Sequence, residues 1–309
     1  MIDAKTRMSF YYLEILYNTM AKRKADRKTK TKRQDSKLIY IPFIVLGVLI
    51  VALVGFTSYS HPVFSPASYI SSSPAPFKFF KVNNQNYAGN STVQIYFISW
   101  YGCPYGATDS WALYKVLTQY GTVNATPGHS LSEPNIPFIP ALWFEGYQPK
   151  PNSNVDFHFL YIYNENLTAT PTGVPVNPTN GSAVTIGLQE IKDNLSFAPW
   201  IYNLVKEYEV DTPIVTTSSG LNDSIAYSTP APHIATLIII TGPGGTYMEI
   251  GFVSPMNPDV IGQSSATAAQ QYAEQLYSQL KSNDITNGSV KTMIDQGSQV
   301  INYVISQVQ

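Results

Sequence analysis

The chain has 309 residues, with 19 Lys and Arg, 20 Asp and Glu and a formal net charge of −1. This length is sufficient for one large hydrophobic core or two small ones. A single cysteine excludes a disulfide within the chain, and the four histidines have no metal-ligand spacing, so we expect no metal site and no cofactor.

The small net charge hides a strong asymmetry between the two ends of the chain. Residues 1–59 carry 11 Lys and Arg against 4 Asp and Glu, whereas residues 60–309 carry 8 Lys, no Arg and 16 Asp and Glu. This division indicates two parts that face different environments.

The boundary between the two parts is the run LIYIPFIVLGVLIVALVGFTSY, residues 38–59, which contains no charged residue. A helix of that length extends roughly 33 Å, enough to cross a hydrocarbon core of about 30 Å. A cleaved signal peptide would have a shorter apolar centre and a clearer small-residue cleavage site than HPVFSPASY offers. The sequence therefore favours a retained transmembrane helix at 38–59.

The basic flank predicts the orientation of this helix. Residues 1–37 form a basic tail that includes AKRKADRKTKTKRQDSK, and no Lys or Arg follows the span until Lys78. The positive-inside rule places this tail in the cytoplasm and the 250 residues after the span outside the cell membrane. Beside a span, the basic run indicates topogenesis and contact with lipid headgroups rather than nucleic-acid binding. Met20 is an alternative start of the protein.

The outer part is poor in charge and rich in glycosylation sequons. We predict candidate glycosylation sites at Asn90, Asn124, Asn166, Asn180, Asn194, Asn222 and Asn287. Carboxylates that are protonated in acid repel one another little, so the composition suits an acidic exterior and an archaeal source.

Residues 60–90 are predicted to be a stalk, and residues 91–309 to be the folded ectodomain. Alternation and β-branched composition predict strands at 92–100, 141–147, 155–163, 212–217, 234–241 and 247–253, with 76–82 as a candidate first strand. Apolar periodicity predicts helices from the Cys103 turn to Tyr120, at 188–195, 198–208, 265–281 and 289–308. We expect loops at 124–150, around its one short strand, and at 168–182.

Strand, turn, helix, strand, helix, hairpin and helix follow one another in the order of a thioredoxin fold. We therefore predict an α/β protein: a thioredoxin-like ectodomain, with a mixed sheet flanked by helices and with insertions, on a single N-terminal transmembrane helix.

The stretch WYGCPYG holds the only cysteine, Cys103, between a predicted buried strand and a predicted helix. A helix N-terminus at this position favours a thiolate. A dithiol oxidoreductase needs a second cysteine to resolve the mixed disulfide, and Gly106 occupies its place. The two-cysteine reaction is excluded within one chain, whereas a mixed disulfide with another molecule or a Cys103-linked dimer stays open.

The segment GCPYGATDSWALYKVLTQYG resembles the Cys-Pro-x-Cys segment of an uncharacterised prokaryotic membrane-protein family with archaeal members, domain-of-unknown-function family 929. The matching residues are Cys103, Pro104, Tyr105, Ala107, Trp111, Ala112 and Leu113. Gly106 departs from the family's pattern. The resemblance covers roughly residues 75–265, is most specific at 93–121, and implies a thioredoxin-like fold with no established activity.

The resemblance also implies a cis-proline that faces the cysteine. KEYEVDTPIV supplies Pro213 after Thr212, and we favour this residue. In the alternative alignment, IATLIIITGPGG is the hairpin that follows the cis-proline, and Ala235 takes the proline's place. The first reading keeps Pro213 beside Pro104, Tyr105 and Gly106 as a structural residue of the site, and the second removes the proline.

Three functions remain open at this stage. We favour a binding or envelope-assembly role of the ectodomain, through extracytoplasmic protein partners and without a dithiol reaction. A monothiol oxidoreductase or thiol-linked chaperone would use Cys103 as its catalytic residue. An adhesin or surface-layer component would use the Tyr-, Asn-, Ser- and Thr-rich surface.

Overall fold

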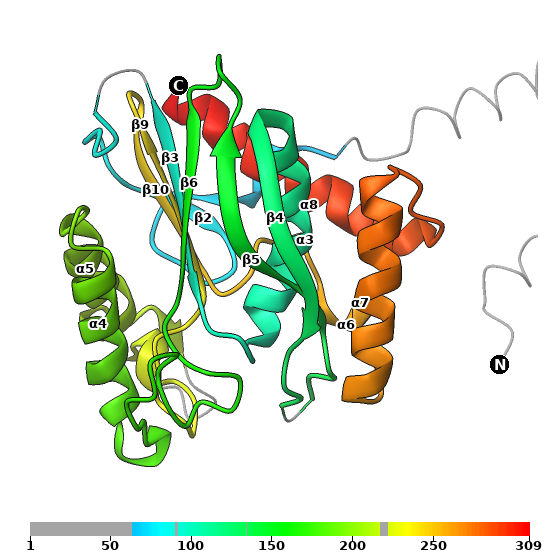
Figure 1. Ribbon diagram of the computed structural model, residues 1–309. Helices are drawn as coiled ribbons and strands as arrows, with labels where there is room; N and C mark the ends of the chain where they lie inside the picture. The colour runs from blue at the N-terminus through cyan, green and yellow to red at the C-terminus, as the bar shows by residue number, and fades with distance from the viewer. Residues whose placement is uncertain (1–63, 90–91, 134, 217–221) are drawn as a thin grey trace, which may run out of the picture. The chain divides into compact units, whose positions relative to one another are not determined.

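A computed structural model describes residues 64–89, 92–133, 135–216 and 222–309 (Figure 1). The predicted cytoplasmic tail and transmembrane helix fall before Phe64 and lie outside the described residues. Within the described ranges, no helix combines the length and the apolar character that a membrane crossing requires. The folded unit runs from Phe64 to Gln309.

The centre of this unit is a six-stranded mixed sheet with the strand order β1-β2-β10-β9-β3-β6. Its strands are β1 (Ile70–Ser71), β2 (Phe79–Asn83), β3 (Val93–Ser99), β6 (Val155–Tyr161), β9 (Leu237–Gly242) and β10 (Gly245–Ile250). β3 and β6 are parallel, β9 is antiparallel to β3, and β9 and β10 form an antiparallel hairpin. The predicted mixed sheet is therefore confirmed.

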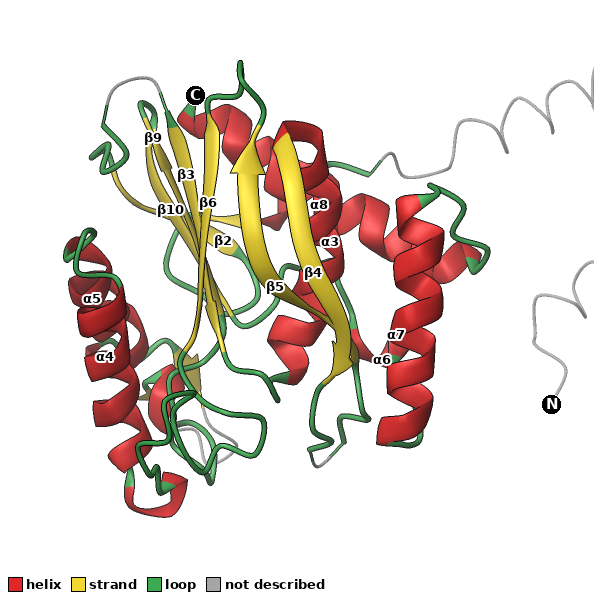
Figure 2. Cartoon of the chain, viewed as in Figure 1, coloured by secondary structure: helices red, strands yellow, loops and turns green. Residues whose placement is uncertain are grey.

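Helices cover both faces of the sheet, as Figure 2 shows. The helices are α3 (Pro104–Tyr120), α4 (Ser182–Asn194), α5 (Trp200–Val205), α6 (Pro258–Ile261), α7 (Ala266–Lys281) and α8 (Gly288–Val308). Short 3-10 or π turns are η2 (Pro66–Tyr69), η3 (Pro178–Asn180), η4 (Lys206–Asp211) and η5 (Ile225–Tyr227). α4 and α5 lie on one face, α3 and α8 lie on the other, and α7 lies outside α3 (Figure 1).

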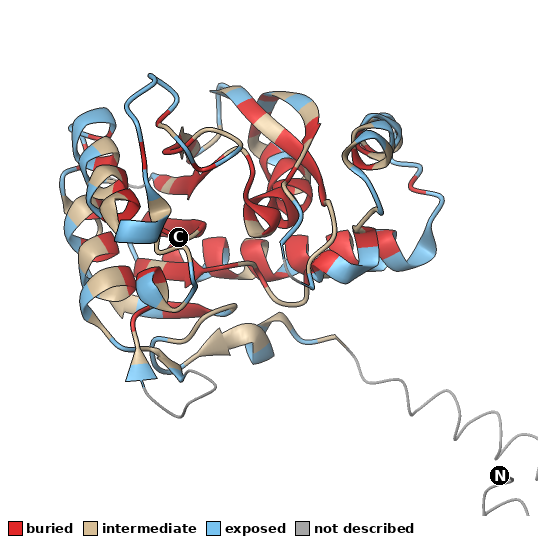
Figure 3. Cartoon of the chain, turned by 90° about the horizontal axis from the view of Figure 1, so that it is seen from below, coloured by how far each residue is buried: buried red, intermediate tan, exposed pale blue. Residues whose placement is uncertain are grey.

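Two hydrophobic cores result from this layering. On β9, Ile238 and Ile240 pack into the core under α3 and α8, whereas Leu237 and Ile239 pack into the core under α4 and α5. A strand buried on both faces has no polar alternation, which explains its uninterrupted apolar sequence. The buried residues form a band between the helices and the sheet (Figure 3).

The region 124–150, expected to be mostly loop, instead contains a long antiparallel hairpin. β4 (Gly121–His129) pairs with β5 (Pro140–Pro149), and α7 packs on the hairpin. The sequence did not predict β4 because this strand contains Pro127 and Gly128, and both residue types are rare in strands. Here the backbone of Gly128 lies against the Trp143 ring, where a side chain would meet that ring at 2.5 Å.

The predicted stalk is also wrong for residues 64–89, because part of this segment belongs to the sheet. Phe79 and Phe80 point to opposite faces of β2, and their exposed fractions are 0% and 1%. Burying an aromatic side chain on each face stabilises β2 by about 1.5–3 kcal/mol per ring. A strand is present near the candidate at 76–82, but it runs from Phe79 to Asn83, and it pairs with β10.

Candidate functional site

Cys103 lies at the point where β3 turns into α3. It is the N-cap of the helix with an extended backbone, and Pro104 occupies the first helical position. Proline fits there because the first N–H groups of a helix have no partner within the helix. The Cys103 side chain enters the molecule, and the exposed fraction of the residue is 3%.

Hydrogen bonds connect the side chains of Ser99, Thr236 and Cys103 in series. The Thr236 hydroxyl, directly before β9, donates a hydrogen bond to Cys103 Sγ at 2.9 Å. Ser99, the last residue of β3, lies 2.7 Å from Thr236 Oγ1. Because Thr236 gives its only hydroxyl hydrogen to the sulfur, Ser99 is the donor in that second bond.

Burial determines the protonation state of the thiol. Burial, with a smaller contribution from the nearby Glu133 carboxyl, raises the pKa of Cys103 from 9.0 to about 11. The hydrogen bonds from Thr236 and from the amides of Gly106 and Tyr105 act in the opposite direction but are outweighed. Cys103 is therefore a thiol rather than a thiolate at neutral pH.

Gly106 leaves no room for a second thiol. A Cβ atom at this position would lie 2.1 Å from Ser99 Oγ and 3.0 Å from Thr236 Oγ1. The space beside Cys103 that a neighbouring side chain on the first turn of α3 would need is filled by the Ser99–Thr236 pair. The absence of a cysteine at 106 is thus built into the packing around it.

The sequence profile of one family, described as Domain of unknown function (DUF929), matches residues 78–307. The chain belongs to the DUF929 family. No curated protein and no solved structure matches it. The family predicted from the Cys103 segment is confirmed, and its description carries no activity.

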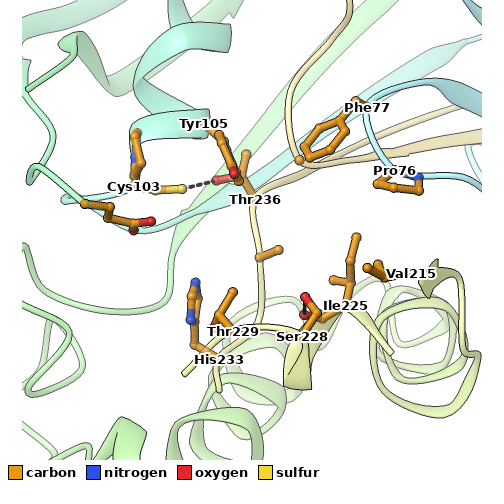
Figure 4. A pocket seen from close by; sticks show the side chains of 14 residues that line it. Pro76, Phe77, Cys103, Tyr105, Val215, Ile225, Ser228, Thr229, His233 and Thr236 are labelled. Carbon is orange, nitrogen blue, oxygen red and sulfur yellow. Dashed lines mark hydrogen bonds between the residues drawn. The ribbon is translucent and has the colours of Figure 1, made fainter. Parts of the chain in front are cut away.

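A pocket of about 140 Å³ opens beside Cys103 in this DUF929 domain (Figure 4). Its walls come from the start of α3, the loop before β2, the loop between β4 and β5, η5 and the segment before β9. The lining residues are Pro76, Phe77, Cys103, Pro104, Tyr105, Glu133, Val215, Ile225, Ser228, Thr229, His233, Ala235, Thr236 and Gly251.

The prediction that Pro213 faces Cys103 is wrong. Thr236 contacts the thiol, and Ala235 lines the same pocket, as the alternative alignment requires. Pro213 is exposed before β7 (Val215–Thr216), which pairs with β8 (Asn222–Asp223). Within the described part of the chain, the one cis peptide bond joins Ser254 and Pro255, so the bond before Pro213 is trans. The local likeness of KEYEVDTPIV was misleading, because sheet pairing brings β9, not β7, beside β3.

Pro104 and Tyr105 lie where predicted, on the pocket wall. Tyr105 makes an edge contact with Phe77, whose ring centroid lies 5.7 Å away. The six predicted glycosylation residues outside the undescribed Asn90 are all exposed. Their accessibility permits glycosylation, which stays a prediction.

Sequence reasoning missed three carboxyl groups buried in this domain. Asp109 on α3, Glu209 on η4 and Glu249 on β10 each have an exposed fraction of 0%. Asp109 Oδ1 accepts from the Val253 amide at 2.9 Å, and Glu209 Oε2 accepts from the Ala235 amide at 2.7 Å. Neither oxygen of Glu249 has a hydrogen-bond partner among the described residues.

Burial raises the pKa of all three carboxyls well above the ordinary range, and the charges of Asp109 and Glu209 raise that of Glu249 further. One signal pointed to Asp109, because it shares a helix face with the buried Leu113 and Val116. Across the described ranges, no group of three His, Cys, Asp or Glu side chains is arranged to hold a metal ion.

Proposed function

We propose that this protein is a membrane-anchored, extracytoplasmic, thioredoxin-like binding domain that acts by protein contact without a dithiol reaction. The observation that carries the proposal is the state of the thiol. Cys103 is buried and protonated, and the Ser99–Thr236 pair fills the space where a resolving thiol would stand.

The order of elements supports the thioredoxin-like part of the proposal. β3, the Cys103 turn, α3, β6, α4, the β9–β10 hairpin and α8 follow one another as the sequence predicts. Residues 121–149, which form the β4–β5 hairpin, are an insertion into that order. The site therefore keeps the position of a redox centre while lacking its second reactive group.

The membrane and extracytoplasmic parts of the proposal rest on the sequence. The uncharged run 38–59 follows a strongly basic tail, which places the tail inside by the positive-inside rule. Exposure of the sequon residues in the folded unit agrees with an outer location. Protease treatment of intact cells and of inverted vesicles tests this orientation, since only intact cells should lose residues 64–309.

The experiment that tests the binding function compares the wild type with Cys103→Ser in the full-length protein. Each is expressed in its membrane, crosslinked to neighbouring proteins with an amine-reactive reagent, and its partners are identified by mass spectrometry. We expect the same partners for both proteins, because the contact needs the pocket wall and not the thiol. Partners that disappear in Cys103→Ser under non-reducing conditions would refute the proposal.

One observation favours a monothiol reaction as the second candidate. Three donors converge on Cys103 Sγ: the Thr236 hydroxyl and the amides of Tyr105 and Gly106. These donors would stabilise a thiolate if a bound partner offset the free-energy cost of deprotonating the buried thiol. Oxidised glutathione would then form a mixed disulfide with Cys103, releasing one glutathione thiol per protein. We expect this exchange to be slower than with an exposed cysteine at neutral pH.

A further inference from the structure

The pocket beside Cys103 has the size of one small molecular group. A cavity of about 150 Å³ accommodates benzene, so roughly six non-hydrogen atoms fit in such a space. The volume here is about 140 Å³. Phe77, Val215, Ile225 and Ala235 supply apolar wall, which suits a short hydrocarbon body.

Three hydroxyl groups of the pocket wall already donate their hydrogens to acceptors within the protein. Ser228 donates to the Ile225 carbonyl at 2.8 Å, and Thr229 donates to the Ala231 carbonyl at 2.9 Å. Thr236 donates to Cys103 Sγ. These hydroxyls therefore retain only lone pairs for a ligand, whereas the Tyr105 hydroxyl can donate or accept.

The imidazole of His233 is also an acceptor toward the pocket. Its Nδ1 lies 2.6 Å from the Ala231 carbonyl, which only accepts, so Nδ1 carries the hydrogen. Burial lowers the pKa of His233, so the ring is neutral and Nε2 keeps a free lone pair. The ring extends from the wall opposite Cys103 and Tyr105 (Figure 4).

Glu133 is an exposed acidic residue among those that line the pocket. Partial desolvation raises its pKa, and no cation or hydrogen-bond donor pairs with its carboxyl in the part of the chain that the structure describes. Without the three buried carboxyls, 13 of the 16 acidic residues from residue 60 onward remain, against 8 Lys. Such a field attracts cations and repels anionic ligands.

From these acceptors we infer that the pocket binds a primary ammonium group on a short apolar stem, with the stem against the apolar wall and the ammonium between Glu133, His233 and the hydroxyls. An ammonium offers three donors and no acceptor, which complements this wall. The inference rests on the proposed binding function, because a lysine side chain of a partner has this chemistry. A free alkylamine has it too.

The test measures binding of butylammonium to the full-length protein in detergent, by ligand-observed NMR at neutral pH. n-Butanol and butyrate are the matched uncharged and anionic probes. We expect butylammonium to bind at least about tenfold more tightly than n-butanol, and butyrate not to bind. Equal binding of butylammonium and n-butanol would overturn the inference.

Variants locate the site. Glu133→Gln should weaken butylammonium binding about threefold to fivefold, the upper part of the range for an exposed ion pair, while Glu133→Asp keeps the charge and most of the affinity. Glu274→Gln, on the exposed face of α7, is the control and should bind as the wild type. Unfolding temperatures without ligand verify that the variants are folded. Unchanged affinity in folded Glu133→Gln would contradict the assignment.

Peptides separate the two sources of the ammonium. A peptide with one lysine and its acetyl-lysine counterpart are compared with butylammonium. Preference for the unmodified peptide supports a partner's lysine as the ligand. Binding of butylammonium but of neither peptide supports the site with a free amine and counts against the proposed protein partner. Failure of all amines overturns the site, whereas the crosslinking of Cys103→Ser tests the proposed function separately.

Discussion

The buried carboxyl of Glu249 should make this protein more stable in acid than at neutral pH. Met248 and Ile250 pack into the core under α4 and α5, so Glu249 points to the other face of the sheet. Burial raises its pKa well above 4.5, and the charges of Asp109 and Glu209 raise it further. The folded protein thus holds a proton that the unfolded chain releases above about pH 4.5.

The sign and size of the effect follow from proton linkage. A raised folded-state pKa contributes stability that is complete below the unfolded pKa and is lost as the pH rises through the folded pKa. Each such proton lowers the free energy of unfolding by about 1.4 kcal/mol per pH unit within that window. Three carboxyls that act together would approach about 4 kcal/mol per pH unit.

The informative perturbation is Glu249→Gln, which keeps the shape and removes the titrating group. We expect the slope of unfolding free energy against pH to become shallower by about 1.4 kcal/mol per pH unit above about pH 5. At neutral pH the variant should be the more stable protein.

Urea unfolding of the full-length protein in detergent, followed by tryptophan fluorescence from about pH 5 to pH 7, measures this slope. Glu274→Gln removes an exposed carboxylate and is the control, with the wild-type slope expected. If Glu249→Gln also kept the wild-type slope, the Glu249 carboxyl would not carry the proton, and the reasoning from burial would be refuted.

Three further outcomes are expected. Gly106→Cys should destabilise the fold by about 1–3 kcal/mol in urea unfolding through the clash with Ser99, and Ser99→Gly in the same chain should recover most of it; an undisturbed single variant would contradict the packing. Thr236→Val should raise the pKa of Cys103 further, shifting the pH profile of its alkylation rate upward; an unchanged profile would show that the hydrogen bond has no effect on the thiol. Trp111→Phe should cost about 2–3 kcal/mol, because the indole donates at 2.8 Å to a backbone carbonyl of β5 inside the core; a loss below about 0.5 kcal/mol would contradict this role.

The sequence predicted most of the regular elements for local reasons. The sequence predicted β3 and α3 because a run of β-branched and aromatic residues is followed by apolar residues at helical spacing. α7 and α8 are preceded by the N-cap residues Ser265 and Asn287, whose side chains accept hydrogen bonds from backbone amides of the first turn. The family followed from the same local features around Cys103.

Long-range pairing was beyond the reach of local patterns. The β4–β5 hairpin contains Pro127 and Gly128, so its strand character depends on its partner and on α7. Thr236, rather than Pro213, reached Cys103 because β9 pairs with β3. β3 ends at Ser99 and its sheet neighbour β9 begins at Leu237, and no spacing rule in the sequence encodes a pairing across so long a stretch of chain.

The sequence by itself determined that one thiol stands at a strand-to-helix turn and that no second cysteine can resolve a disulfide within the chain. Only the tertiary structure decided what surrounds that thiol. Ser99 and Thr236 fill the place of its missing partner, and burial keeps Cys103 protonated. The reason is physical: composition fixes which groups exist, whereas desolvation and hydrogen bonding depend on segments that meet only after folding.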